Sequence, residues 1–98
     1  MDTYSEVQVE TAKKLRRAGI IPGLVLEDVD SGLRLLEALE KGGLTAAEIT
    51  YRTKAAPQVI EAAKKRFPNL LLGAGTVLTI EQLNQAFDLG ASFAVAPG

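Results

Sequence analysis

Hydrophobic and polar positions along the chain follow two alternating periods. Short apolar runs, which are typical of buried strands, occupy residues 20–27, 46–53, 70–75 and 92–98. Segments with apolar residues at helical spacing flank or separate these runs, at residues 5–19, 28–42, 57–67 and 79–90. The pattern predicts one α/β domain over residues 1–98, with an N-terminal helix followed by strands and helices in alternation.

Turn and cap residues mark the ends of the predicted helices. Asp28 or Asp30 is the candidate N-cap of the second helix. Pro57 stands in the first turn of the third helix, where its missing N–H costs nothing. Thr79 with Gln82 three residues later has the spacing of a capping box for the last helix. These signals support the assignment of helices between the apolar runs.

An internal period connects the four predicted strands. Equivalent positions recur every 23 residues, at Val25, Glu48, Leu71 and Ala94. Apolar strands joined by helices favour parallel pairing in right-handed crossovers with the helices outside. Two architectures fit this pattern, an open doubly wound sheet and a (βα)8 barrel. A barrel with this period would need about 190 to 200 residues, so four strands would form half of a (βα)8 TIM barrel.

The composition excludes several classes of function. A net charge of −1, with lysines spread among glutamates, provides no basic face for nucleic acid and no polybasic patch for a membrane. The chain has no histidine and no cysteine, so imidazole and thiolate are absent as bases, nucleophiles and metal ligands. No apolar segment is long enough to span a bilayer, and a cytoplasmic location is expected. Any chemistry must use carboxylate, amine, hydroxyl or backbone groups.

The predicted strand AEITYRT carries polar side chains at alternate positions. Glu48, Thr50 and Arg52 share one face, whereas Ile49 and Tyr51 point to the other face. In a barrel the polar face is the interior near its mouth, where active sites form. Two interpretations stay open. Glu48 is a catalytic carboxylate, or it is a structural one that Arg52 neutralises in an ion pair.

The glycines of LLLGAGTVLT invite comparison with phosphate-binding loops. Gly73 and Gly75 lack the third glycine of a dinucleotide fingerprint, because Leu78 stands in its place, and no Gly-Lys-Ser/Thr follows. The simplest alternative is that both glycines let a strand turn into a loop beneath a packed helix. Thr76 then follows as a candidate hydroxyl donor. Lys54 is the only lysine in a loop that follows a strand, and it is expected to be a solvated side chain.

Three motifs in consistent order connect the chain with a known family. GGLTAAEITYRT, LLLGAGTVLT and GASFAVAPG resemble the first half of the 2-keto-3-deoxy-6-phosphogluconate (KDPG) and 2-keto-4-hydroxyglutarate (KHG) aldolases. The resemblance covers the chain from Ile20 to Gly98. It implies a class I aldolase on a (βα)8 barrel, usually a homotrimer, that needs no cofactor and no metal. In such enzymes a lysine condenses with the keto group of pyruvate to a Schiff base, and a carboxylate moves protons.

The resemblance also implies roles for individual residues. Glu48 matches the proton-transfer glutamate of the family, and Arg52 and Thr76 match the arginine and threonine that bind the substrate carboxylate. Pro97 matches a proline that lines the pocket. The Schiff-base lysine of the family lies on the sixth strand of the barrel, and its phosphate-binding turns follow the last two strands. The 98 residues contain no counterpart of either.

Two hypotheses about function therefore stay open. In the first, the chain is the N-terminal half of an aldolase that forms pyruvate and an aldehyde from a small keto acid. In the second, it is a catalytically inactive half-barrel, a folding or assembly module that associates with itself by pairing its edge strands. The complete enzyme would be a homotrimer, and the fragment an edge-paired homo-oligomer. A flavodoxin-like nucleotide module is disfavoured because the acidic stretch LEDVD follows the first strand, where such a module needs a phosphate-binding loop.

Overall fold

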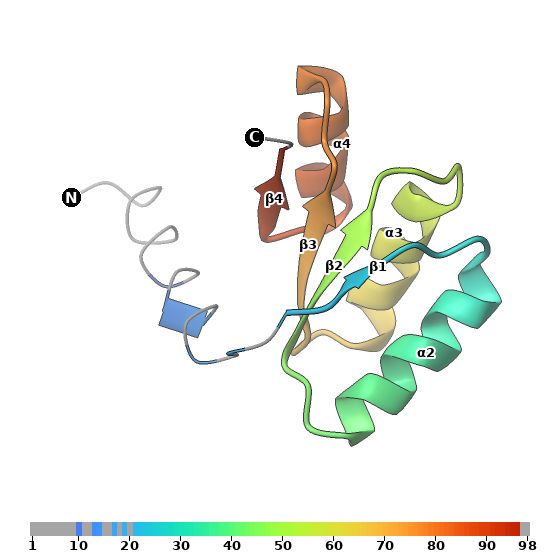
Figure 1. Cartoon of the computed structure of the whole chain (residues 1–98), viewed down its shortest axis with the longest axis vertical. Coiled ribbons are helices and arrows are strands. Elements are labelled where there is room, and N and C mark those ends of the chain that lie inside the picture. The colour runs from blue at the N-terminus through green and yellow to red at the C-terminus, as the bar shows by residue number, and fades with distance from the viewer. Residues whose placement is uncertain (1–9, 11–12, 15–16, 18, 20, 97–98) are drawn as a thin grey trace.

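Strands and helices alternate along the chain, as the hydrophobic pattern predicted. The computed structural model describes residues 10, 13–14, 17, 19 and 21–96 (Figure 1). Its elements are β1 (Gly23–Leu24), α2 (Val29–Lys41), β2 (Ala46–Thr50), α3 (Ala56–Arg66), β3 (Leu71–Gly75), α4 (Ile80–Leu89) and β4 (Phe93–Val95). Most of the helix predicted over residues 5–19 lies outside the described residues. The strands β2 and β3 and the residues that directly follow them, which carry Glu48, Arg52 and Thr76, are all described.

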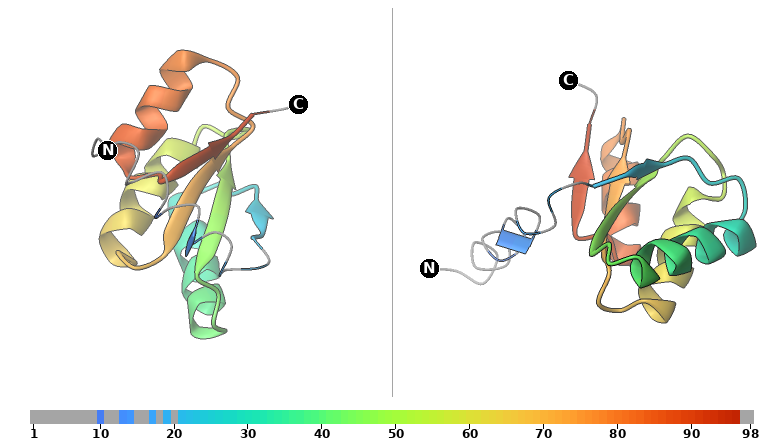
Figure 2. Two further views of the ribbon diagram at one scale, coloured as in Figure 1. Left: turned by 90° about the vertical axis from the view of Figure 1, so that its left-hand side faces the viewer. Right: turned by 60° about the horizontal axis from the view of Figure 1, so that its bottom comes forward.

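The four strands form one parallel sheet in the order β1-β2-β3-β4. Each strand lies beside its successor in the chain, and the connecting helices α2, α3 and α4 share one core against the same face of the sheet (Figures 1 and 2). A doubly wound sheet would reverse its strand order and place helices on both faces. The described part of the chain does neither. The predicted α/β class is confirmed, and the winding is that of a partial barrel.

The strand register corrects the period of 23 residues that the sequence suggested. Glu48 lies opposite Gly23 on β1 and Gly73 on β3, and Gly73 lies opposite Phe93 on β4. Ala94, the predicted equivalent of Glu48, is one residue out of this row and therefore points to the other face of the sheet. The constant period fails because the helix-and-loop segments between equivalent positions differ in length: the spacing is 25 residues from Gly23 to Glu48 and from Glu48 to Gly73, but 20 residues from Gly73 to Phe93.

Polar side chains cap two of the helices. Asp28 is the N-cap of α2, and its carboxylate accepts a hydrogen bond from the backbone N–H of Ser31 at 2.8 Å. Thr79 is the N-cap of α4, and its hydroxyl oxygen accepts from the N–H of Gln82 at 3.1 Å. The side chain of Gln82 accepts from Leu78 N–H at 2.8 Å, one residue before the position that a capping box requires. Both predicted caps are confirmed, the second with this change of partner.

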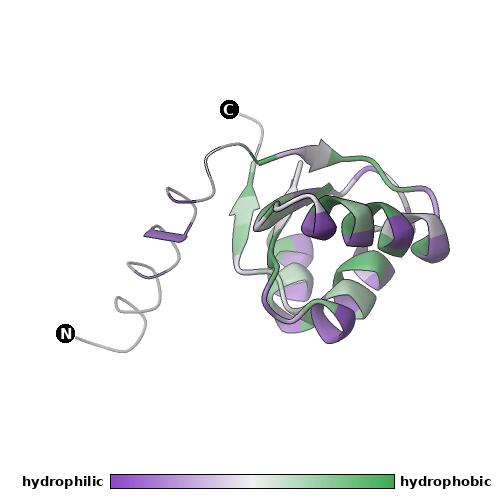
Figure 3. Ribbon diagram, turned by 90° about the horizontal axis from the view of Figure 1, so that it is seen from below, coloured by the Kyte–Doolittle hydropathy of each residue, from purple (hydrophilic) through white to green (hydrophobic). Residues whose placement is uncertain are grey.

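The hydrophobic core lies between the sheet and its helices. Ile49 of β2 and Leu72 of β3 contribute to one buried cluster with Leu36 of α2 and with Val59 and Ile60 of α3. Figure 3 shows that hydrophobic and hydrophilic residues both occur on each of these helices, as expected for helices that pack on one side only. Burial of each large side chain stabilises the fold by about 1.5–3 kcal/mol. The opposite face of the sheet carries no described helix.

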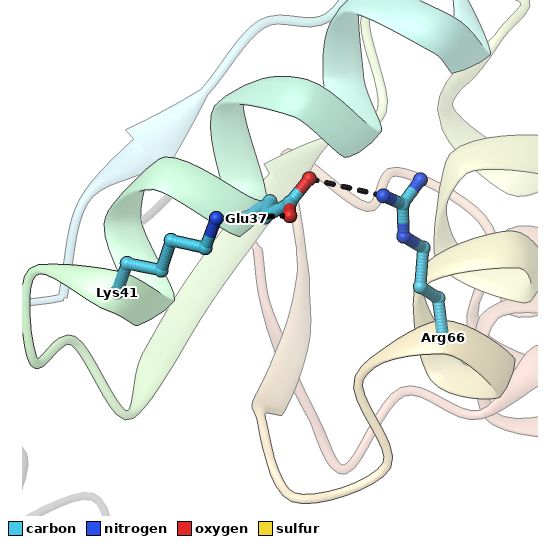
Figure 4. Close-up of polar contacts among 3 residues, drawn as sticks. All are labelled: Glu37, Lys41 and Arg66. Atoms are coloured by element: carbon cyan, nitrogen blue, oxygen red, sulfur yellow. Dashed lines mark hydrogen bonds and ion pairs between the residues drawn. The ribbon is translucent and has the colours of Figure 1, made fainter.

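A small group of charged residues joins α2 to α3 on the surface. Glu37 of α2 contacts Lys41 one turn later at 3.3 Å and Arg66 of α3 at 3.0 Å (Figure 4). All three side chains are substantially exposed, so each pair contributes at most about 1 kcal/mol. These residues lie near the carboxyl ends of their helices, which in a βα repeat is the end remote from the carboxyl ends of the strands. The group supports the fold and takes no part in the candidate site.

Candidate active site

The face of the sheet opposite the helices, which we call the open face, carries Glu48. Successive strand residues point to opposite faces, and Ile49 is fully buried in the core beneath the helices. Glu48 and Thr50 therefore point to the open face, where Glu48 is half-buried and Thr50 is buried. The predicted faces of these three residues are confirmed.

The carboxylate of Glu48 lies over a position on β3 that has no side chain. A Cβ atom added to Gly75 would lie 2.6 Å from Cδ and 2.9 Å from Cγ of Glu48, closer than Cβ contacts in real proteins. On the other side, a Cβ atom at Gly23 would lie 3.8 Å from Oε2 of Glu48. Glycine on both neighbouring strands thus leaves room for this side chain, and the space on β3 is the one it fills.

The ring of Phe93, on β4, lies over Gly73 of β3, as the carboxylate of Glu48 lies over Gly75. A Cβ atom added to Gly73 would lie 2.6 Å from Cδ2 of Phe93 and still closer to two further ring atoms. Gly73 and Gly75 both belong to β3, and neither has a positive φ. The prediction that these glycines turn the strand into a loop is therefore wrong. They are needed because side chains from the two adjoining strands lie directly on them.

Arg52 lies in the loop after β2 and not on the strand. β2 ends at Thr50, although the N–H of Tyr51 still donates to the carbonyl oxygen of Gly75 at 2.7 Å. Arg52 is exposed, and the ion pairs among the described residues include neither Arg52 nor Glu48. The predicted strand position of Arg52 is therefore wrong. The alternative of a structural ion pair with Glu48 is also not realised in the described part of the chain.

Two side-chain hydrogen bonds fasten the loop that carries Arg52. Thr53 Oγ1 donates to the carbonyl oxygen of Leu26 at 2.6 Å and so ties this loop to the segment after β1. The hydroxyl of Tyr51 donates to Oε1 of Gln85 on α4 at 3.1 Å. Partial burial raises the pKa of Tyr51, because it disfavours the phenolate. Sequence reasoning missed Thr53, since one threonine in a loop carries no signal of its distant partner.

Thr76 directly follows β3 in an uncommon backbone conformation. Its φ is 55°, and among the described residues it is the only non-glycine residue with a positive φ. This region is unfavourable for a β-branched side chain, and residues held in it concentrate at functional sites. The structure brings Thr76, the loop of Arg52 and the Glu48 carboxylate to the carboxyl ends of β2 and β3. Pro97, the fourth predicted site residue, lies outside the described residues.

The arrangement suits proton transfer and the binding of a small anion. In the described structure the half-buried carboxylate of Glu48 has no ion-pair partner. The guanidinium group of Arg52 follows β2, and the hydroxyl group of Thr76 follows β3.

Within the described residues, no three His, Cys, Asp or Glu side chains are grouped closely enough to hold a metal ion. None of the described helices is long and apolar enough to cross a membrane.

Comparisons with known proteins indicate the family of the chain. The family model of the KDPG and KHG aldolases matches residues 11–98. The 2-dehydro-3-deoxy-phosphogluconate aldolase of Haemophilus influenzae is 44% identical over 96 residues, which are 98% of this chain and 44% of that protein. The enzyme of the same name from Treponema pallidum is 45% identical over 84 residues, which are 86% of this chain and 40% of that protein.

Solved structures give the same result. The KDPG aldolase of Zymomonas mobilis superposes with a TM-score of 0.82 at 40% identity, over 90% of this chain and 42% of that one. The enzyme from Legionella pneumophila, with pyruvate captured as a covalent carbinolamine, has a TM-score of 0.78 at 40% identity over 83% of this chain and 39% of that one. The chain thus spans well under half the length of these relatives, and within that span it belongs to the KDPG and KHG aldolase family.

Proposed function

We propose that the chain is the N-terminal half of a class I aldolase that cleaves 2-keto-3-deoxy-6-phosphogluconate or 2-keto-4-hydroxyglutarate to pyruvate and an aldehyde. One observation carries the proposal. Glu48 holds its carboxylate over Gly75, at the carboxyl end of β3, without an ion-pair partner among the described residues. A carboxylate that is not held in an ion pair can accept and return a proton, and a fixed position directs that exchange to the substrate. Within the described residues, Glu48 has both of these features.

The chemistry requires an amine that this half does not supply. In the Legionella pneumophila relative, pyruvate is held as a carbinolamine, the addition product of an amine and a keto group. Loss of water from a carbinolamine gives an iminium ion, which accepts the electron pair of the breaking carbon–carbon bond. We assign the amine to a lysine in the remaining part of the barrel. In this chain Glu48 moves the proton, Arg52 and Thr76 bind the carboxylate of the keto acid, and Pro97 lines the pocket.

The remaining properties of the complete enzyme follow from the same proposal. The iminium ion serves as the electron sink, so the reaction requires neither a cofactor nor a metal. The partner is a small keto acid, not nucleic acid or a membrane. The complete enzyme is a cytoplasmic homotrimer, as the resemblance of the motifs implies.

The test supplies the missing part of the barrel. The purified chain is mixed with the segment of the Haemophilus influenzae aldolase that lies beyond the matched region, and pyruvate release from KDPG is followed. Turnover is expected in the mixture only, and borohydride with pyruvate should label the added segment. A stoichiometric adduct on Lys54 of the isolated chain would contradict the proposal, and so would a stable complex of the two halves without turnover.

A second candidate function rests on the open face and the sheet edges. β1 and β4 each have one described neighbour, and exposed Val25 and Val95 follow or end these edge strands. Unpaired edges and exposed apolar side chains promote association. An inactive half-barrel module that pairs with a second copy would use the same surface. The isolated chain would then form a defined oligomer and would gain no activity from the added segment.

A further inference from the structure

Two neighbouring glycines of β3 each receive a side chain from a different strand. The ring of Phe93, from β4, lies on Gly73, and the carboxylate of Glu48, from β2, lies on Gly75. The register places Gly73 directly opposite Glu48, whereas Gly75 lies two residues further toward the carboxyl end of the sheet, opposite Thr50. The side chain of Glu48 therefore does not lie over Gly73, the residue directly opposite it. It extends diagonally and lies over Gly75.

The occupied position explains this diagonal reach. Directly opposite residues on adjacent strands are closer than diagonal ones, so an unhindered side chain at Glu48 would have the surface of Gly73 within easy reach. The ring of Phe93 already fills that surface, since an added Cβ on Gly73 would lie 2.6 Å from its Cδ2. Gly75 is the remaining bare position on β3. It is also the last residue of that strand and directly precedes Thr76.

We infer that Phe93 is a positioning residue for the reaction, in a role that rests on the proposed function of Glu48. The ring closes the position opposite Glu48 and directs the carboxylate toward the carboxyl ends of β2 and β3, where Thr76 and the loop of Arg52 lie. Phe93 acts through Glu48 and needs no contact with the substrate. Because a displacement of about 1 Å can lower a rate about a hundredfold, a carboxylate shared between the two glycines would be a poor proton-transfer group.

The first part of the test measures where the carboxylate lies, without any turnover. In the isolated chain, nuclear Overhauser contacts are recorded between the side-chain protons of Glu48 and the Hα protons of Gly73 and Gly75. In wild type, contacts to Gly75 are expected. In Phe93→Ala they should weaken at least threefold, and contacts to Gly73 should appear. Phe87→Ala, which removes an exposed ring on α4, is the matched control and should leave the pattern of wild type.

A second variant guards against loss of folding in Phe93→Ala. Phe93→Leu keeps an apolar side chain but cannot cover Gly73 as a ring does, so it should give a partial shift of the same contacts. If either variant is folded, as judged by amide dispersion, and Glu48 keeps its wild-type contacts to Gly75 alone, the inference is wrong.

The second part of the test asks whether the position matters for the reaction. In the mixture with the added half-barrel, Phe93→Ala should lower kcat at least tenfold and leave KM within threefold of wild type. A shifted carboxylate with unchanged kcat would overturn the positioning role. Failure of the proposed function has a different signature, because wild type itself would then show no turnover while the nuclear Overhauser pattern still reports on Phe93.

Discussion

Glu48 and Gly75 are complementary across two strands. The carboxylate of Glu48 occupies the space that a Cβ atom on Gly75 would need, 2.6 Å from Cδ and 2.9 Å from Cγ of the glutamate. A glycine loses more backbone freedom on folding than alanine does, which costs roughly 0.5–1 kcal/mol in the middle of a strand and less at its end, where Gly75 lies. The sheet tolerates this cost at a position where any side chain would displace the candidate proton-transfer group.

Gly75→Ala is therefore expected to destabilise the chain by about 1–3 kcal/mol, as other overpacking substitutions do. The double variant Gly75→Ala/Glu48→Ala should recover most of this loss, because the clashing side chain is gone. Chemical denaturation of the four members of the cycle measures the coupling. Gly73→Ala is the control. It should be rescued by Phe93→Ala and not by Glu48→Ala, and additive effects of Gly75→Ala and Glu48→Ala would contradict the geometry.

Glu48→Gln tests the proton-transfer role in the mixture with the added half-barrel. The substitution keeps the size of the side chain and removes its base, so turnover should fall by about a hundredfold or more. Trapping of pyruvate by borohydride should persist, because condensation with lysine does not remove the same proton. Glu61→Gln, at an exposed position of α3, serves as the matched control. An unchanged kcat in Glu48→Gln would exclude the role.

Thr76→Asn should separate stability from binding. Asparagine tolerates the left-handed conformation at φ 55° better than a β-branched residue does, so the free energy of unfolding should rise by up to about 1 kcal/mol. The same variant loses the hydroxyl group proposed to bind the keto acid, and KM in the mixture should rise. Thr79→Asn is the control, since its φ of −130° carries no such strain and asparagine is an equally good N-cap. Lower stability of Thr76→Asn would contradict the expected strain.

Asp28 should contribute to the pH dependence of stability. The hydrogen bond from the backbone N–H of Ser31 lowers the pKa of Asp28 below its ordinary value of 3.8, and the side chain of Ser31 adds to this effect. A lowered pKa in the folded state means that the contribution is complete above about pH 4 and is lost as the pH falls through the folded-state pKa. Asp28→Asn keeps a cap that does not titrate, so its stability should fall less between pH 5 and pH 2.5. The free energy of unfolding is measured by chemical denaturation of both proteins at each pH. If it fell by the same amount in wild type and in Asp28→Asn between pH 5 and pH 2.5, Asp28 would make no such contribution.

The isolated chain is expected to associate at tens of micromolar, because β1 and β4 each have one described neighbour and no helix of the described residues covers the open face. Light scattering should detect a dimer or a larger species. Val95→Lys places a charge on the edge strand β4 and should shift the equilibrium toward monomer, whereas Leu78→Lys changes a more exposed residue outside the strands and should not. A monomer at all concentrations would count against association through this surface.

Local signals in the sequence were enough to predict the alternation of elements, the caps Asp28 and Thr79, and the face of Glu48. Each of these depends on residues within one turn of helix or one strand, where hydrogen bonding and side-chain alternation operate over short distances. The motifs around Glu48 and Gly75 were also enough to identify the aldolase family, which the comparisons confirm. The roles of Glu48, Arg52, Thr76 and Pro97 remain predictions.

Contacts between strands could be decided only by the tertiary structure. The register that sets Glu48 opposite Gly73 depends on the whole segment of loops and helix between β2 and β3, and no local pattern encodes how such a segment offsets adjacent strands. A local pattern also does not show which residues of other strands lie over a glycine, so the sequence suggested a turn at Gly73 and Gly75. The structure shows instead that side chains of two other strands cover both positions. A glycine in the sequence shows only that no side chain is present at that position. Which distant residue occupies the space it leaves is determined by packing, and here packing selects Phe93 at Gly73 and Glu48 at Gly75.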